Sequence, residues 1–171
     1  MNITRVVSLL VAAFLIVPLA YAEDSAVEAQ KLADHVKHAK VSLERGLQVS
    51  EKEGKPISGK FELEDGKLQL SVYTEKSGKY YEVVVDHTSG KIAKVEEITS
   101  GDDLEAAKTQ AEAMTKAKRS LRDATRAAEK AHKGFHALSV TPSLKDGHPL
   151  ATVVVNKDHE TRTVTEKLDQ G

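Results

Sequence analysis

The chain has 171 residues, and its 25 lysine and arginine side chains nearly balance 26 aspartate and glutamate side chains, giving a formal net charge of −1. A charge this close to zero provides no overall field for binding nucleic acid. The absence of cysteine excludes disulfides, thiolate nucleophiles and cysteine-ligated metal or iron–sulfur centres.

Residues 1–22 have the pattern of an export signal. Arg5 precedes an apolar run over residues 6–17, and Ala20-Tyr21-Ala22 is the small-x-small sequence that signal peptidases recognise. The run is shorter than the about 20 apolar residues of a membrane-spanning helix. We therefore expect a periplasmic or secreted protein that begins at Glu23 and has no transmembrane segment after cleavage; an uncleaved N-terminal anchor is the alternative.

Residues 23–99 are predicted to form one helix followed by four antiparallel strands. Apolar residues recur at three- and four-residue steps through Leu47, which indicates a single helix. Alternating apolar residues then predict strands on both sides of Asp65-Gly66, a pair suited to a tight hairpin. Further turns at Ser77-Gly78 and Thr88-Ser89-Gly90 delimit a third strand and a short fourth strand.

Residues 100–171 have the same order in a weaker form. Apolar residues from Leu104 to Ala128 lie at helical spacing and predict one long helix that stops at Gly134. Three strand-like stretches follow, with Asp146-Gly147 between the first two. Nothing in this part of the sequence corresponds to the fourth strand of the first copy.

The two copies share short segments. Ala39-Lys40-Val41-Ser42-Leu43 recurs as Ala117-Lys118-Arg119-Ser120-Leu121, and one Asp-Gly turn follows each. We predict an α+β protein with two modules, residues 23–99 and 100–171, each one helix packed on an antiparallel sheet of three or four strands.

The first module resembles the PepSY domain family. The resemblance is carried by Glu64-Asp65-Gly66-Lys67, by the sequence KYYEVVVD over residues 79–86, and by Ser89-Gly90-Lys91-Ile92. The second module keeps only the helix and its Asp-Gly turn, so it resembles a degenerate second copy. The resemblance implies an extracytoplasmic bacterial module that binds and restrains peptidases or other proteins. The family brings no catalytic residues and no cofactor.

The sequence contains no Gly-x-Ser-x-Gly, His-Glu-x-x-His or glycine-rich phosphate-binding loop. We therefore expect a protein that is not an enzyme. The predicted function is protein binding, with possible restraint of an extracytoplasmic peptidase. The partner would be held by surface occlusion or by pairing with an exposed strand edge, although charged residues such as Arg162 and Lys167 favour a protected edge.

Seven histidines offer an alternative, a periplasmic metal-binding or sensing protein. His35 and His38 lie three residues apart and His132 and His136 lie four apart, spacings at which two histidines on one helix bind zinc or copper. Gly134 interrupts the second pair, and no third ligand is evident for the first. We predict surface histidines and assign no metal ligand.

Two groups of residues are candidates for a contact surface. Tyr80, Glu82 and Val84 share one face of the predicted third strand, where cross-strand packing is the alternative role. Arg122 and Arg126 belong to a basic stripe on the second helix, in which Lys118 and Lys130 continue the spacing of four residues. The stripe suggests a further alternative, an envelope structural or interaction protein. A solvated helix face matched to the helix dipole explains the same stripe.

Overall fold

The computed structural model describes residues 19–170. The predicted signal segment falls outside this range at residues 1–18, and Leu19–Ala22 lie within the first helix. The elements in chain order are α1 Leu19–Val36, α2 Leu43–Ser50, β1 Lys55–Glu64, β2 Lys67–Lys76, β3 Lys79–Val85, β4 Ile92–Ile98, α3 Gly101–Thr115, α4 Leu121–Ala131, β5 His136–Lys145, β6 His148–Lys157 and β7 Glu160–Lys167. Within residues 19–170, none of the helices is both long and apolar enough to cross a membrane.

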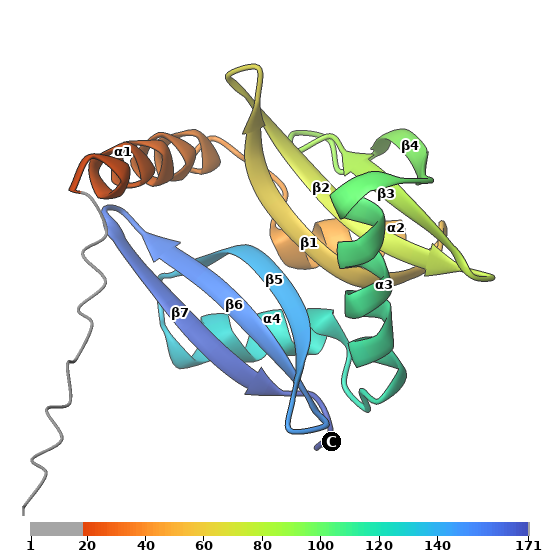
Figure 1. Cartoon of the computed structure of the whole chain (residues 1–171). Helices are drawn as coiled ribbons and strands as arrows, with labels where there is room; N and C mark the ends of the chain where they lie inside the picture. Colours follow the sequence, from red (N-terminus) through yellow and green to blue (C-terminus); the bar gives the residue numbers. More distant parts are fainter. Residues whose placement is uncertain (1–18, 171) are drawn as a thin grey trace, which may run out of the picture.

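All seven strands form one antiparallel sheet in the order β4-β3-β2-β1-β5-β6-β7 (Figure 1). The predicted α+β class is confirmed, but the two parts do not have separate sheets. β1 and β5 join them through the pairs Gly59 with Val140 and Lys60 with Ser139. We call this pairing the β1–β5 junction. It links residues far apart in the chain, which local alternation does not reveal; the division at residues 99 and 100 stays a prediction.

Each predicted helix is in fact two helices, so the prediction of one helix per module is wrong. The chain leaves the helical conformation at residues 37–42 and again at residues 116–120, which we call the first and second helix breaks. Ser42 Oγ accepts a hydrogen bond from the Arg45 amide at 3.2 Å, and Ser120 Oγ accepts one from the Asp123 amide at 3.1 Å. Both serines are therefore N-caps, which satisfy amides at a new helix start.

The helix breaks are the feature that the sequence repeats. In each half, two consecutive amides of the break donate to one carbonyl oxygen: Lys40 and Val41 to His87 at 2.9 and 3.0 Å, and Lys118 and Arg119 to Leu168 at 2.7 and 3.0 Å. Each accepting carbonyl follows the third strand of its own half. The break is thus anchored to the sheet in the same way in both halves.

The strands repeat as well. β1 begins at Lys55 and β5 begins at His136, 81 residues later, and the same offset relates β2 to β6 and β3 to β7. The helices α2 and α4 begin 78 residues apart, and α4 has 11 residues where α2 has 8, which accounts for the difference. The hairpin turns also correspond, since Asp65 and Asp146 both have positive φ, at 48° and 52°. Among residues 100–170, β4 has no counterpart, in agreement with the sequence pattern.

The core lies between the sheet and the pair α2 and α4. Leu43 and Leu47 of α2 and Leu121 of α4 are buried within one apolar cluster that includes strands from both halves. Figure 1 shows α2 and α4 behind the sheet and α3 in front of it. α3 is fixed on its face by Ser58 Oγ, which donates to Gln110 Oε1 at 2.7 Å. Both faces near the β1–β5 junction are therefore covered by helices.

Candidate functional site

Tyr80, Glu82 and Val84 do not form a freely exposed patch. All three are partly buried on the sheet face that α3 covers. Tyr80 packs against the core and lines a hollow of about 380 Å³ that also includes Met114 at the end of α3. Glu82 accepts a hydrogen bond from Gln69 Nε2 at 3.4 Å on the neighbouring strand. Cross-strand and helix packing therefore explain these side chains.

Arg122 and Arg126 lie on α4 and pair with acidic side chains at the two ends of α2, Glu51 being the residue that follows its last turn. Arg126 Nε donates to Glu44 Oε1 at 3.2 Å, and Arg122 Nη1 lies 3.3 Å from Glu51 Oε1. Lys118 is not on α4 but in the second helix break. The predicted basic stripe is therefore not one continuous surface, and its two arginines hold α2 beside α4. Such partly exposed pairs each contribute about 0–1 kcal/mol.

Two of the histidines contact other charged side chains, and the seven histidines form no ligand group of three among the described residues. Within residues 19–170, no group of three or more histidine, aspartate or glutamate side chains is close enough to hold a metal ion. His132 Nδ1 accepts from Arg162 Nη1 at 3.1 Å, and His148 Nδ1 lies 2.8 Å from Asp169 Oδ2. The alternative of a metal-binding or sensing protein stays a prediction.

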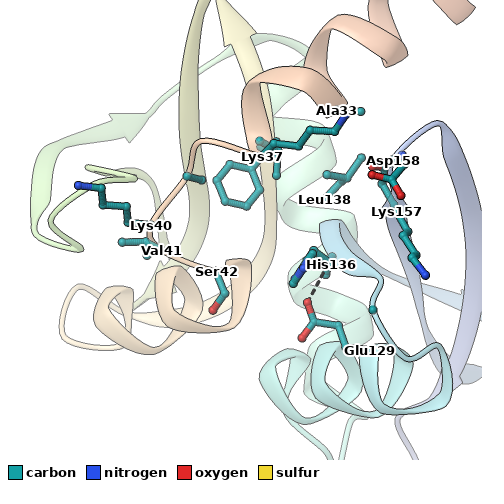
Figure 2. A pocket seen from close by; sticks show the side chains of 16 residues that line it. Ala33, Lys37, Lys40, Val41, Ser42, Glu129, His136, Leu138, Lys157 and Asp158 are labelled. Atoms are coloured by element: carbon teal, nitrogen blue, oxygen red, sulfur yellow. Dashed lines mark hydrogen bonds between the residues drawn. The ribbon is translucent and has the colours of Figure 1, made fainter.

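Sequence reasoning missed two hollows beside the β1–β5 junction. The first hollow, of about 510 Å³, lies between the first helix break and the segment that joins α4 to β5. Phe61 and Leu138 contribute apolar surface to it. Figure 2 shows Lys40 on the side of the helix break and Lys157 and Asp158 on the opposite side.

The second hollow, of about 500 Å³, lies between the second helix break and the segment that joins α2 to β1. Pro56 and Ala117 are its partly exposed apolar residues, above core residues of α2, α3 and α4. Lys55 Nζ crosses one end and donates to the Met114 carbonyl at the end of α3, at 2.7 Å. This hollow also takes in Arg122, the one predicted contact residue that lies beside either hollow.

The two hollows are related by the repeat. Each combines the helix break of one half with the strand start of the other, so Lys40 in the first hollow corresponds to Lys118 in the second. Likewise Ala137 corresponds to Pro56, with the offset of 81. Neither hollow exists within one half, because residues of both halves line each of them. The repeated helix-break sequence was the only signal of them in the chain.

Electrostatics at the second helix break stabilise the start of α4. Ser120 Oγ donates to Asp123 Oδ2 at 2.7 Å while accepting from the Asp123 amide, a reciprocal cap. The hydrogen bond from Ser120 lowers the pKa of Asp123, and the nearby guanidinium groups of Arg126 and Arg122 lower it further. The Asp123 carboxyl group therefore stays ionised to a lower pH than an ordinary aspartate.

The chain matches no protein-family model, and no curated protein matches it. Among solved structures, it is similar to a Clostridium difficile protein provisionally described as a lipoprotein. The sequence identity is 14%, the TM-score is 0.38, and the match covers 71% of this chain and 80% of that one. A similarity of this size supports no inference about function.

Proposed function

We propose that this is a non-catalytic, extracytoplasmic, PepSY-like binding protein that holds a segment of another protein at the hollows beside the β1–β5 junction. The observation that supports the proposal is the pair of repeat-related hollows, about 510 and 500 Å³, each with apolar residues inside and lysines at its rim. Protein interfaces typically insert an apolar anchor into such a pocket and surround it with polar contacts.

The segments that resemble the PepSY family favour a structural role for the motif itself. Asp86 Oδ1 accepts hydrogen bonds from the Thr88 and Ser89 amides at 3.0 and 2.6 Å, and Gly90 follows with a φ of 71°. The aspartate and the Ser-Gly pair thus build one tight turn between β3 and β4. Because the motif builds a turn, we propose that the partner protein is bound elsewhere on the surface, at the two hollows.

Restraint of a peptidase is the specific form of binding that the resemblance suggests. In that form, a surface segment of the peptidase occupies a hollow, and this protein covers the active site by its bulk. No covalent step is needed. The export signal predicted for residues 1–22 supports this form of the proposal, because it would bring this protein to the compartment of an extracytoplasmic peptidase.

Affinity capture from an envelope extract tests this function. The purified protein, tagged at its C-terminus, is expected to enrich a protein whose peptidase activity falls as more of the binding protein is added. The matched control is the double variant Lys40→Glu/Lys118→Glu, which alters the rim of both hollows and is expected to enrich less of the same protein. Equal enrichment by the control, or enrichment of nothing, contradicts the proposal.

A further inference from the structure

We propose that the second hollow binds an acidic segment of a protein partner, with an apolar side chain entering the hollow and carboxylates contacting its basic rim. This inference rests on the proposed function and assigns the electrostatic contacts with the partner to one of the two hollows. It follows from a difference in charge between the two hollows, which are otherwise related by the repeat.

The second hollow has the stronger positive charge. Four basic side chains and a single acidic one line it: Lys55, Lys118, Arg119, Arg122 and Glu51. Three lysines and two acidic side chains line the first hollow, and one of those lysines, Lys37, is paired with Asp34 at 3.0 Å. The acidic segment therefore complements the second hollow better than the first.

The excess arises at three repeat-related positions. Val41 in the first helix break corresponds to Arg119 in the second, and His136 at the start of β5 corresponds to Lys55 at the start of β1. Arg122 at the start of α4 corresponds to Glu44 of α2, which does not line the first hollow. All three differences add positive charge at the second hollow. The difference is therefore local to the site and not a property of the whole surface, whose formal charge is near zero.

Not every basic group at the rim is already paired. Arg119 Nη1 contacts Glu166 at 3.3 Å and the Lys167 carbonyl at 2.9 Å. In contrast, the Lys118 side chain has no ion pair among residues 19–170. Arg122 pairs with Glu51 through Nη1 at 3.3 Å, but its Nε is buried without an acceptor. A buried donor that lacks an acceptor is costly, so a carboxylate that reaches Lys118 and Arg122 would be stabilised by both.

The size and lining of the second hollow explain why the bound segment should carry an apolar side chain. Its volume of about 500 Å³ lies within the range of about 300–1,000 Å³ typical of ligand pockets. Pro56 and Ala117 present apolar surface next to the basic rim. A segment that places one aliphatic side chain between acidic residues fits this arrangement.

A peptide titration followed by amide chemical shifts tests the inference. The probe is acetyl-Glu-Glu-Leu-Glu-Glu-amide, added to the purified, isotope-labelled protein at low salt. We expect saturable shifts for the amides of Gly54, Lys55 and residues 117–122, and binding that weakens as salt is added. The neutral probe acetyl-Gln-Gln-Leu-Gln-Gln-amide is expected to bind at least about tenfold more weakly, because it lacks the carboxylates.

Two variants at repeat-related positions localise the effect. Lys118→Glu is expected to weaken binding of the acidic probe at least about tenfold, whereas Lys40→Glu at the first hollow leaves it within about twofold. Both lysines are exposed, so both variants keep the fold. Equal loss in the two variants, equal binding of the two probes, or no shifts at millimolar peptide overturns the inference.

The capture experiment separates this inference from the proposed function. If wild-type protein and Lys118→Glu enrich the same partner equally, the second hollow is not the acidic-segment site, while the binding function stands. If wild-type protein enriches nothing, the proposed function is overturned, and the peptide titration reports on the second hollow by itself.

Discussion

Two serine side chains determine where α2 and α4 begin. Ser42 and Ser120 each accept a hydrogen bond from the amide three residues later. Without such an acceptor, the first amides of a helix have no partner within the helix. Ser120 does more than Ser42, because it also donates to the carboxylate of Asp123.

The first prediction concerns this cap. Ser120→Ala removes both hydrogen bonds and is expected to lower the free energy of unfolding by about 1 kcal/mol. Urea unfolding measures the difference. Ser143→Ala is the matched control, because Ser143 is exposed on β5 and caps no helix. A loss in the control as large as that in Ser120→Ala would refute the capping role.

The second prediction concerns pH. The pKa of Asp123 is held below its ordinary value of 3.8 by the hydrogen bond from Ser120 and by two arginines. A carboxyl group with a lowered pKa contributes stability above its unfolded-state pKa, and that stability is lost as the pH falls through the lower folded-state pKa. Asp123→Asn is therefore expected to be less stable than wild type near pH 6.

The difference between wild type and Asp123→Asn should shrink as the pH falls below the ordinary aspartate pKa of 3.8 toward the lower folded-state pKa, because the carboxyl group then becomes protonated. Free energies of unfolding at several pH values measure it. A difference that stays constant between pH 6 and pH 3 would show that the charge of Asp123 is not the cause. Asp103→Asn, an exposed residue in the first turn of α3, serves as the comparison.

At the scale of elements, the packing of α2 on the sheet depends on a close contact. A Cβ atom at Gly46 of α2 would lie 2.7 Å from Leu70 Cδ2 of β2, and Leu70 is fully buried. The corresponding residues in the second half are Ala124 and Ala151, both fully buried. The first half thus combines a small residue on the helix, Gly46, with a large one on the strand, Leu70, whereas the second half has alanine at both positions.

This size exchange gives the third prediction. Gly46→Ala improves helix propensity by about 1 kcal/mol but overpacks Leu70, at a cost of about 1–3 kcal/mol, so it is expected to destabilise the protein. In a Leu70→Ala background, the same Gly46→Ala change should instead be stabilising, because the space is open. A double-mutant cycle by urea unfolding measures this reversal of sign. The same sign in both backgrounds would contradict it.

At the scale of the whole molecule, one apolar core joins the two halves. The buried cluster contains Leu43 and Val72 from the first half and Leu121 and Val153 from the second. Since α2 and α4 pack together and β1 pairs with β5, neither half can bury its apolar surface alone. The complete chain should therefore unfold as one unit.

The fourth prediction tests whether the two halves fold only together. A fragment of residues 23–99 exposes the edge of β1 and the side of α2 that contacts α4, so it should not persist as a folded monomer. Circular dichroism and analytical ultracentrifugation will show an unfolded or self-associated fragment. A monomeric fragment with its own cooperative transition would show instead that residues 23–99 form an independent domain.

The sequence predicts local features well and distant pairings poorly. Alternating apolar residues and the Asp65-Gly66 turn predict the first hairpin because both signals lie within a few residues. The helix breaks are not predicted, because the apolar spacing continues through them, as it does from Val36 to Leu43 across the first. The serine that caps each second helix is nevertheless present in both repeated segments. The two hollows could not be predicted, because each is lined by residues from both halves of the chain, which are joined where Gly59 pairs with Val140.

That meeting point has a geometric meaning. Val140 is 81 residues after Gly59, so each of these residues lies opposite its own counterpart, and Lys60 and Ser139 continue the same register. A pseudo-twofold axis therefore passes between Gly59 and Val140, as in an isologous dimer whose subunits have been fused into one chain. A substitution at the axis therefore changes the packing of both halves, whereas a substitution away from the axis changes only one. The pairing of β1 with β5 can stay unchanged while the charges of the two hollows differ.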